Sequence, residues 1–200
     1  RGFGFLLRDR RFLGLTFIGG LGMSSFFVFL ASSSFIYIDY FGLTPTEYSI
    51  AFAANAVGFI GASQFSARLG TRFGMARVVI TAVAAHTAFA LILFVVTVAS
   101  VASLAVLIAM LLVAFACLGL VIPSTMVLAL EEHGSIAGMA SALGGTLQMI
   151  AGGIMIVIVS MVFDGTALPM VTTITLCAVG ALALSMATLY RRESAPQPAE

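Results

Sequence analysis

A run without any charged residue, from position 78 to position 130, constrains this chain more than any other feature. At 1.5 Å per residue, one helix over this run would be about 80 Å long. The hydrocarbon core of a bilayer is about 30 Å thick and is crossed by about 20 residues. The run therefore predicts two membrane-spanning helices, with a tight turn at residues 97–103.

Four more stretches free of charge are long enough to span a membrane: residues 12–38, 48–67, 134–163 and 169–190. Composition agrees, because 61% of the residues are hydrophobic and 8% are charged, against about 45–50% and about 25% in soluble domains. This excludes a soluble enzyme, a nucleic-acid binder, a disordered tail and a disulfide scaffold. We expect an all-α integral membrane protein, with residues 1–200 forming one six-helix domain.

The few charges predict the orientation of the helices. Six spans place both termini on one side, and every basic residue falls on that side: Arg1, Arg8, Arg10, Arg11, Arg68, Arg72, Arg77, Arg191 and Arg192. The opposite side holds Asp39, Glu47 and Asp164. By the positive-inside rule, the arginine side and both termini are cytoplasmic, as is the tail at 191–200. Glu131 and Glu132 also fall on the arginine side, but acidic residues weigh little in this rule.

The six spans divide into two units of similar length, at about 12–98 and 104–190. The units enter the membrane from opposite sides, which is typical of the 3+3 inverted repeat in transporter halves. Because 200 residues is short for a transporter and the chain begins with Arg1, we expect a fragment of a longer protein.

No Asp, Glu, Lys or Arg lies in the middle of a span. Proton-coupled transport normally leaves such a residue in the bundle interior, so a proton carrier would have to lie outside these residues. Cys117 and Cys177 have no metal-ligand spacing, and we expect no metal and no cofactor. His86 lacks an acidic partner and is expected to pack as a neutral side chain.

Uncharged polar residues and aromatic residues remain as candidates for a substrate cavity. Asn55 and Gln148 either form interhelical hydrogen bonds or line the cavity, because an unpaired amide is costly in hydrocarbon. Phe29 and Ser33 are four residues apart and share one helix face. The candidate cavity residues are Ser25, Phe29, Ser33, Tyr37, Asn55 and Gln148.

A second group of residues predicts close helix packing or gating. Small residues four apart in the fifth span allow another helix to approach closely, and Pro123 removes a backbone hydrogen bond from the fourth span and predicts a kink there. The candidates are Pro123, Ser141, Gly144, Gly145 and Gly152.

The connection between the second and third spans carries glycines and arginines in a regular pattern: Gly61, Arg68, Gly70, Arg72 and Gly74. It predicts a tight cytoplasmic hairpin. The pattern resembles the loop signature of the major facilitator superfamily, although the usual acidic residue is missing. Residues 31–55, 118–123 and 137–148 are similar to helices seven to eight and ten to eleven of bicyclomycin-resistance (Bcr/CflA) type drug:proton antiporters.

The resemblance covers nearly the whole chain and implies the C-terminal half of a twelve-helix transporter. Such proteins export apolar, often cationic, drugs or metabolites across the bacterial inner membrane by alternating access, driven by inward proton flow. The implied partners are the lipid bilayer, a small substrate and protons carried by the N-terminal half, with no nucleic acid.

Two other functions stay open. A transporter of the same superfamily for a sugar, a polyamine or a siderophore precursor would have a similar sequence. A six-helix intramembrane enzyme or structural membrane protein is the alternative of another class. An enzyme needs a nucleophile with a base or a metal cluster, and His86 and the serines have no such partner, so we expect no enzymatic activity.

Overall fold

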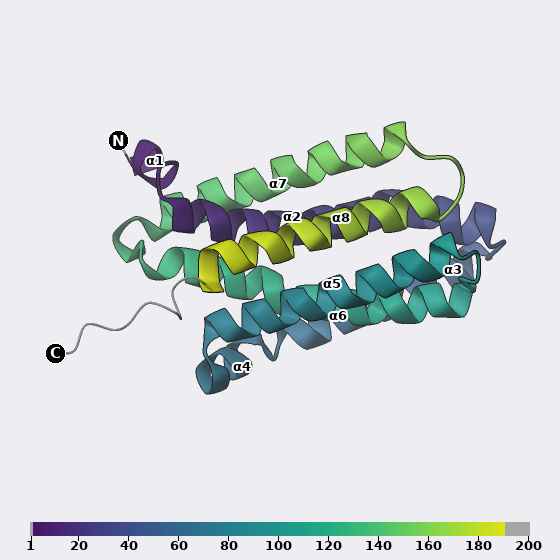
Figure 1. The fold of residues 1–200 in the computed structure, drawn as a ribbon, viewed down its shortest axis with the longest axis horizontal. Helices are drawn as coiled ribbons and strands as arrows, with labels where there is room; N and C mark the ends of the chain where they lie inside the picture. The colour runs from purple at the N-terminus through teal and green to yellow at the C-terminus, as the bar shows by residue number, and fades with distance from the viewer. Residues whose placement is uncertain (1, 191–200) are drawn as a thin grey trace.

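The computed structural model describes residues 2–190, and these residues form a bundle of long helices (Figure 1). Six helices in this range are long and apolar enough to cross a membrane. The spans are α2 (Arg10–Ser34, continued by the π-helix Phe35–Tyr40), α3 (Pro45–Ser63), α5 (Met75–Val98), α6 (Leu104–Glu131), α7 (Ala137–Met161) and α8 (Leu168–Ser185, continued by the π-helix Met186–Tyr190). The short elements are α1 (Gly2–Leu6), α4 (Ser66–Phe73) and a 3-10 turn at Gly134–Ile136.

The expected turn inside the uncharged run is confirmed. Helix α5 ends at Val98 and α6 begins at Leu104. Between them Ser100 has a positive φ of 55°, and the Ser103 side chain accepts a hydrogen bond from the backbone of Val106 at the start of α6. A positive φ at a residue other than glycine is uncommon and fits a tight reversal of the chain.

Local sequence signals explain two of the helix starts. The Asp9 carboxylate accepts hydrogen bonds from the backbone N–H groups of Arg11 and Phe12, which caps α2. Thr44 and Glu47 form a reciprocal capping box at the start of α3, with Pro45 at the first helical position.

The connection between the second and third spans differs from the expected hairpin. The second span was expected to reach residue 67, but α3 ends at Ser63 and a separate eight-residue helix, α4, follows. Glycine and arginine at regular spacing suggested a turn, yet Leu69 and Phe73 lie four residues apart and give α4 an apolar face. The turn itself falls at Gly74, whose φ of 86° suits glycine.

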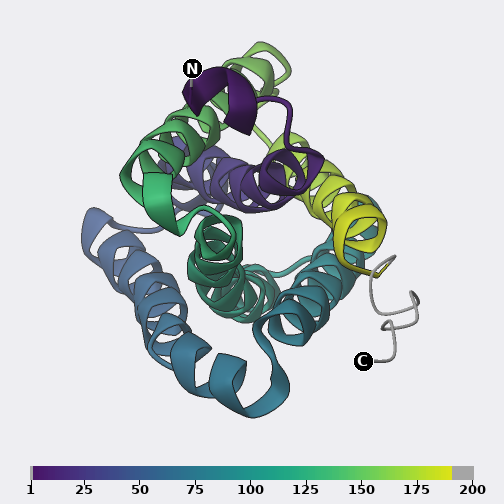
Figure 2. The same cartoon turned by 90° about the vertical axis from the view of Figure 1, so that its left-hand side faces the viewer.

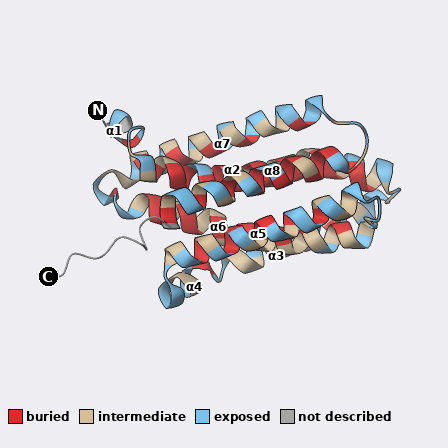
Figure 3. Cartoon of the chain, viewed as in Figure 1, coloured by how far each residue is buried: buried red, intermediate tan, exposed pale blue. Residues whose placement is uncertain are grey.

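Helices α2 and α6 lie at the centre of the bundle. Helix α2 packs against α7, α8 and α6, and α6 packs against α3 and α5. The end-on view shows α3 and α7 on one side of this central pair and α5 and α8 on the other (Figure 2). Burial follows this arrangement. In the apolar stretch of the first span, α2, 56% of the residues are buried, against 17% in that of α3 and 22% in that of α7 (Figure 3).

The packing of the first three spans is mirrored by that of the last three. Exchanging α2 with α6, α3 with α7 and α5 with α8 turns the main helix contacts into one another. At the α5–α8 interface, Thr87 Oγ1 donates to the Ala178 carbonyl at 3.0 Å, and Thr175 Oγ1 donates to the Ala90 carbonyl at 3.1 Å. Such reciprocal bonds are the arrangement that an in-plane twofold axis produces, and they favour the expected inverted repeat.

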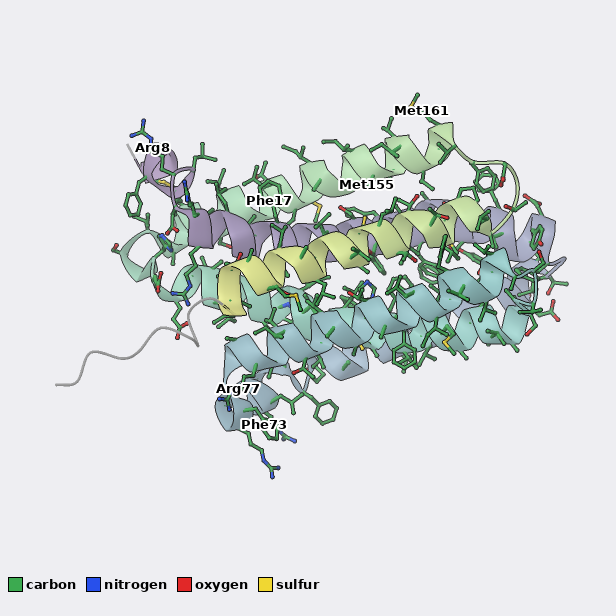
Figure 4. All side chains as sticks on the ribbon, viewed as in Figure 1. Arg8, Phe17, Phe73, Arg77, Met155 and Met161 are labelled. Atoms are coloured by element: carbon green, nitrogen blue, oxygen red, sulfur yellow. The ribbon has the colours of Figure 1, made fainter. Side chains whose placement is uncertain are left out.

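The charged residues lie at the two ends of the bundle. Arg8 and Arg77 lie at one end and Met161 at the other (Figure 4). The far end includes the α7–α8 turn, where hydrogen bonds from the Thr166 side chain and backbone lower the pKa of Asp164. The expected cytoplasmic tail, with Arg191 and Arg192, lies outside the described residues, as does Arg1.

Candidate functional site

Aromatic side chains from three helices meet between α2, α3 and α6. We call these residues the aromatic cluster: Phe26, Phe29 and Tyr37 from α2 and its π-helical end, Tyr48, Phe52 and Phe59 from α3, and Phe115 from α6. Because α2 and α6 are the central helices and α3 is the least buried span, the cluster lies between the centre of the bundle and its most exposed span.

Phe29 is the centre of this cluster. Its ring lies 4.8 Å from the Phe115 ring, 5.8 Å from Phe52 and 6.3 Å from Tyr37, measured between centroids. The Phe52 ring is stacked almost parallel to it, at 10°. Ring pairs at such distances contribute about 0.5–1.5 kcal/mol beyond the burial of their surface. The electron-rich ring faces also attract cations.

Polar groups border the aromatic cluster on its α3 side. The Ser33 hydroxyl lies 3.1 Å from the Tyr48 hydroxyl, within hydrogen-bonding distance. Asn55 Nδ2 donates to the Ala51 carbonyl of its own helix at 3.0 Å. The Tyr37 and Asn55 side chains lie within reach of each other, but no hydrogen bond of good geometry joins Tyr37 Oη or Asn55 Oδ1 to a described residue.

Tyr37 Oη and Asn55 Oδ1 are two buried polar atoms without a well-formed hydrogen bond. Tyr37 is fully buried and Asn55 is 3% exposed, so bulk water does not reach them in this conformation. Leaving a buried polar group unsatisfied costs about 1–3 kcal/mol. The cost disappears if the α2–α3 interface opens and the two atoms meet water or a ligand.

A π-helical segment places Tyr37 against α3. Residues Phe35–Tyr40 continue α2 with a wider turn, so that Ile36 and Tyr37 are both fully buried. π-helical turns occur often at functional sites. The spacing of Phe29 and Ser33 predicted one shared face, with Ser25 and either Ile36 or Tyr37 nearby. The structure brings Phe29, Ser33 and Tyr37 together with Asn55. Phe52, Phe115 and the π-helix were not anticipated.

Gln148 and Ser25 lie away from the aromatic cluster. Gln148 is buried where α7 meets α2 and α6, and a Cβ added at Gly19 would lie 2.7 Å from Gln148 Nε2 and 2.8 Å from Thr125 Oγ1. Ser25 Oγ donates to the Leu21 carbonyl and interacts with the Cys177 thiol on α8. The six candidates therefore fall into one group of four and two separate positions.

The predicted small residues of α7 lie on two different faces. Gly144 and Gly152 face α2, and a side chain at Gly152 would overlap the Phe27 ring. Gly145 has open space around its Cα, and Ser141 is exposed. Helix α6 continues through Pro123 as one helix over Leu104–Glu131.

A close helix approach that the sequence analysis missed lies between α3 and α6. A side chain at Gly119 would collide with the backbone carbonyl of Phe59, so that only glycine fits there. This contact brings α3 against α6 next to the aromatic cluster, and Gly58 makes a second contact with Leu112. A glycine in an apolar run carries no sign of its partner.

The residues of the α3–α5 connection take separate positions. Gly61 has open space around it, Gly70 lies against Met75, and Gly74 makes the turn. Arg68 and Arg72 are exposed, and the Arg72 guanidinium lies 5.2 Å from the centre of the Phe73 ring.

Polar side-chain contacts at the same end join the start of α2 to the end of α6. Arg11 pairs with Glu132, and His133 Nε2 lies 3.0 Å from the Asp9 carboxylate. His133 Nδ1 lies 3.0 Å from the Ala129 carbonyl. Glu132 was expected only as an exception to the charge rule.

His86 is buried, with Nδ1 3.0 Å from the Ala114 carbonyl of α6, which gives it an interhelical contact. Within residues 2–190 no cluster of three or more His, Cys, Asp or Glu could hold a metal ion.

Curated proteins of two bacteria resemble the chain. It is 32% identical to an uncharacterized MFS-type transporter, YdgK, of Bacillus subtilis, over 84% of this chain and 41% of that protein. It is 27% identical to a bicyclomycin resistance protein homolog of Haemophilus influenzae, over 90% of this chain and 45% of that protein. No protein-family model matches the chain.

The chain spans less than half the length of these two relatives. Its six membrane-spanning helices are half of the twelve that the resemblance implies. The chain is therefore an all-α membrane domain homologous to transporters of the major facilitator superfamily, and it corresponds to about half of such a transporter.

Proposed function

We propose that this chain is the C-terminal half of a secondary-active exporter that moves lipophilic, often cationic, compounds across the bacterial inner membrane. The aromatic cluster forms one wall of its substrate cavity. The observation that carries this proposal is a pair of buried polar atoms without a well-formed hydrogen bond, Tyr37 Oη and Asn55 Oδ1, beside stacked aromatic rings. Aromatic faces suit a lipophilic cation, and the two oxygens supply hydrogen-bond acceptors.

The cluster is closed in this conformation, so the proposal requires α3 to move. Helix α3 has the smallest buried share of the six spans, and its contacts are mainly with α6. A shift of α3 away from α2 exposes Phe29, Tyr37 and Asn55 together. Such a shift fits alternating access, in which packed elements have two discrete arrangements.

Proton coupling is the second part of the proposal. The spans of this chain hold no acidic residue near their centres, whereas intramembrane carboxylates are the usual proton relays. We assign the proton-carrying residue to the part of the whole transporter that the relatives have and this chain does not cover. The arginine-bearing end is assigned to the cytoplasm by the positive-inside rule.

A different solute, such as a sugar, a polyamine or a siderophore precursor, is the alternative. Sugars are bound through many hydrogen bonds and polyamines through carboxylates. The described residues of the aromatic cluster offer few hydrogen-bonding groups and no carboxylate, which favours a lipophilic cargo.

Thiol labelling in membranes tests the proposal. Asn55→Cys is made in a Cys117→Ser/Cys177→Ser background of the protein expressed from its natural gene, and membranes are treated with a charged, water-soluble thiol reagent. Ala90→Cys, which lies in the tightly bonded α5–α8 interface, is the matched control.

We expect labelling at position 55, slowed by the lipophilic cation tetraphenylphosphonium, and none at position 90. Equal protection of both positions, with and without the cation, would contradict a cavity at the aromatic cluster. Labelling that a sugar slows and the cation leaves unchanged would favour the alternative solute.

A further inference from the structure

A cavity lies between α4, α5 and α6, and it shares only α6 with the aromatic cluster. Its volume is about 460 Å³, within the range of about 300–1,000 Å³ that ligand pockets occupy. The lining is almost entirely apolar and includes Leu69, Phe73, Ala82, Ala85 and Cys117. One charged side chain, Arg77, belongs to the lining.

The cavity runs from the arginine-bearing end of the bundle toward the middle of the membrane. Along α5, the lining extends from Arg77 to Ala85, which is about 12 Å at 1.5 Å per residue. Cys117 lies near the centre of α6 and marks the deep end. This depth is close to half of a hydrocarbon core about 30 Å thick, which is the thickness of one leaflet's acyl chains.

Helix α4 covers the polar end of the cavity. Leu69 and Phe73 are four residues apart and share the face that lines the cavity. Arg68 and Arg72 are also four apart, on another face, and both are exposed. Figure 4 shows Phe73 and Arg77 together at this end of the bundle. A short helix with one apolar and one basic face is suited to the membrane–water interface.

Basic residues gather where α4 meets the start of α5. Arg68, Arg72 and Arg77 follow one another in the chain, and the sequence has no acidic residue between Glu47 and Glu131. Each basic side chain near an anionic membrane surface contributes about 1 kcal/mol of attraction. The cavity thus combines an apolar interior as deep as one leaflet with basic side chains at its entrance.

We propose that this cavity binds an anionic phospholipid of the leaflet on the arginine-bearing side. One acyl chain lies between α5 and α6, and the phosphate lies against Arg77 beneath α4. An amphiphile of this kind uses both parts of the site, whereas a free phosphate or a neutral lipid uses one. The bound lipid fixes α4, the only described helix between α3 and α5, and so biases the position of α3.

Alkylation of Cys117 measures occupancy of the cavity directly. The Cys177→Ser variant of the chain is reconstituted in nanodiscs of phosphatidylcholine, with or without phosphatidylglycerol, and treated with a membrane-permeant maleimide. Arg77→Gln tests the charged entrance, Arg77→Lys keeps its charge, and Arg8→Gln is a control at the same end of the bundle. Inorganic phosphate added to pure phosphatidylcholine nanodiscs tests the head group alone.

We expect phosphatidylglycerol to slow the alkylation about fivefold, the equivalent of about 1 kcal/mol. The Arg77→Lys and Arg8→Gln variants retain this protection, and Arg77→Gln loses it. Equal rates in both lipids, protection that survives in Arg77→Gln, or protection by phosphate alone would overturn the proposal.

A second variant keeps the test valid if Arg77→Gln does not fold. Thr81 lines the cavity and is exposed, so Thr81→Phe fills the cavity without replacing a buried side chain. Native mass spectrometry should detect bound phosphatidylglycerol on the unaltered chain and not on Thr81→Phe. Equal lipid retention by both proteins would also overturn the proposal. Neither result depends on what the transporter carries.

Discussion

The α5–α8 interface and the α2–α3 interface are held together in opposite ways. Across α5–α8, Thr87 and Thr175 each donate to a carbonyl of the other helix, and both acceptors are buried. Across α2–α3, the Phe29 and Phe52 rings stack nearly parallel, while Tyr37 Oη and Asn55 Oδ1 lack a well-formed hydrogen bond.

In the proposed function, this difference separates a fixed part of the domain from a movable one. Interhelical hydrogen bonds in a membrane contribute about 0.6 kcal/mol each on average, and they require one specific register. Ring contacts tolerate sliding, and oxygens without a well-formed hydrogen bond lower the cost of opening because water satisfies them. We therefore expect α5 and α8 to keep their relative position while α3 moves. We call the α5–α8 pair the rigid back of the domain.

The largest expected effect concerns the contact that holds α3 in its closed position. Gly119→Val places a side chain against the Phe59 backbone, which cannot yield as a flexible side chain can. We expect a loss of about 3 kcal/mol of stability, measured by unfolding in mixed detergent. Gly145→Val, where space is open, is the control. Equal unfolding midpoints for Gly119→Val and Gly145→Val would show that the contact between Gly119 and Phe59 does not hold α3 in place.

The next effect concerns ligand affinity. Phe29→Leu keeps an apolar side chain but removes the ring at the centre of the aromatic cluster. We expect tetraphenylphosphonium to bind about tenfold more weakly, as befits a partly desolvated cation–π contact of about 1–2 kcal/mol. Leu91→Ala, at an exposed position of α5, should leave binding unchanged. A similar loss in both variants would indicate a non-specific site.

A smaller effect tests the rigid back. The double variant Thr87→Val/Thr175→Val removes both reciprocal hydrogen bonds at nearly constant volume. We expect it to lower the free energy of unfolding by about 1 kcal/mol and to leave cation binding intact. A loss of binding without a loss of stability would place the α5–α8 interface in the site.

The smallest effect comes from the Tyr37 hydroxyl. Tyr37→Phe removes a buried oxygen that lacks a well-formed hydrogen bond, so the closed domain should keep its stability or gain up to about 1 kcal/mol. Transport by the whole protein should fall, because the acceptor is missing when the cavity opens. A clear loss of stability would mean that the hydroxyl is satisfied, and the argument for opening would weaken.

The sequence predicted the membrane class, the six spans and the reversal at residues 97–103, because charge placement and length decide these features. It also placed Phe29 and Ser33 on one face, since helical spacing is local, but it put Ser25 near them, which the structure places against α8. It missed helix α4, whose apolar face consists of only two side chains among glycines and arginines. It also missed the partners of Gly119 and Gln148, because a contact between distant helices leaves no trace in either segment alone.

Distances between spin labels test the central claim most directly. One label at Leu91→Cys on α5 is paired with either Val57→Cys on α3 or Val179→Cys on α8, all three at exposed positions, in a background without Cys117 and Cys177. On addition of tetraphenylphosphonium, the account predicts that the 57–91 distance distribution shifts while the 91–179 distribution stays unchanged. A constant 57–91 distance, or an equal shift in both pairs, would contradict a moving α3 against a fixed α5–α8 back.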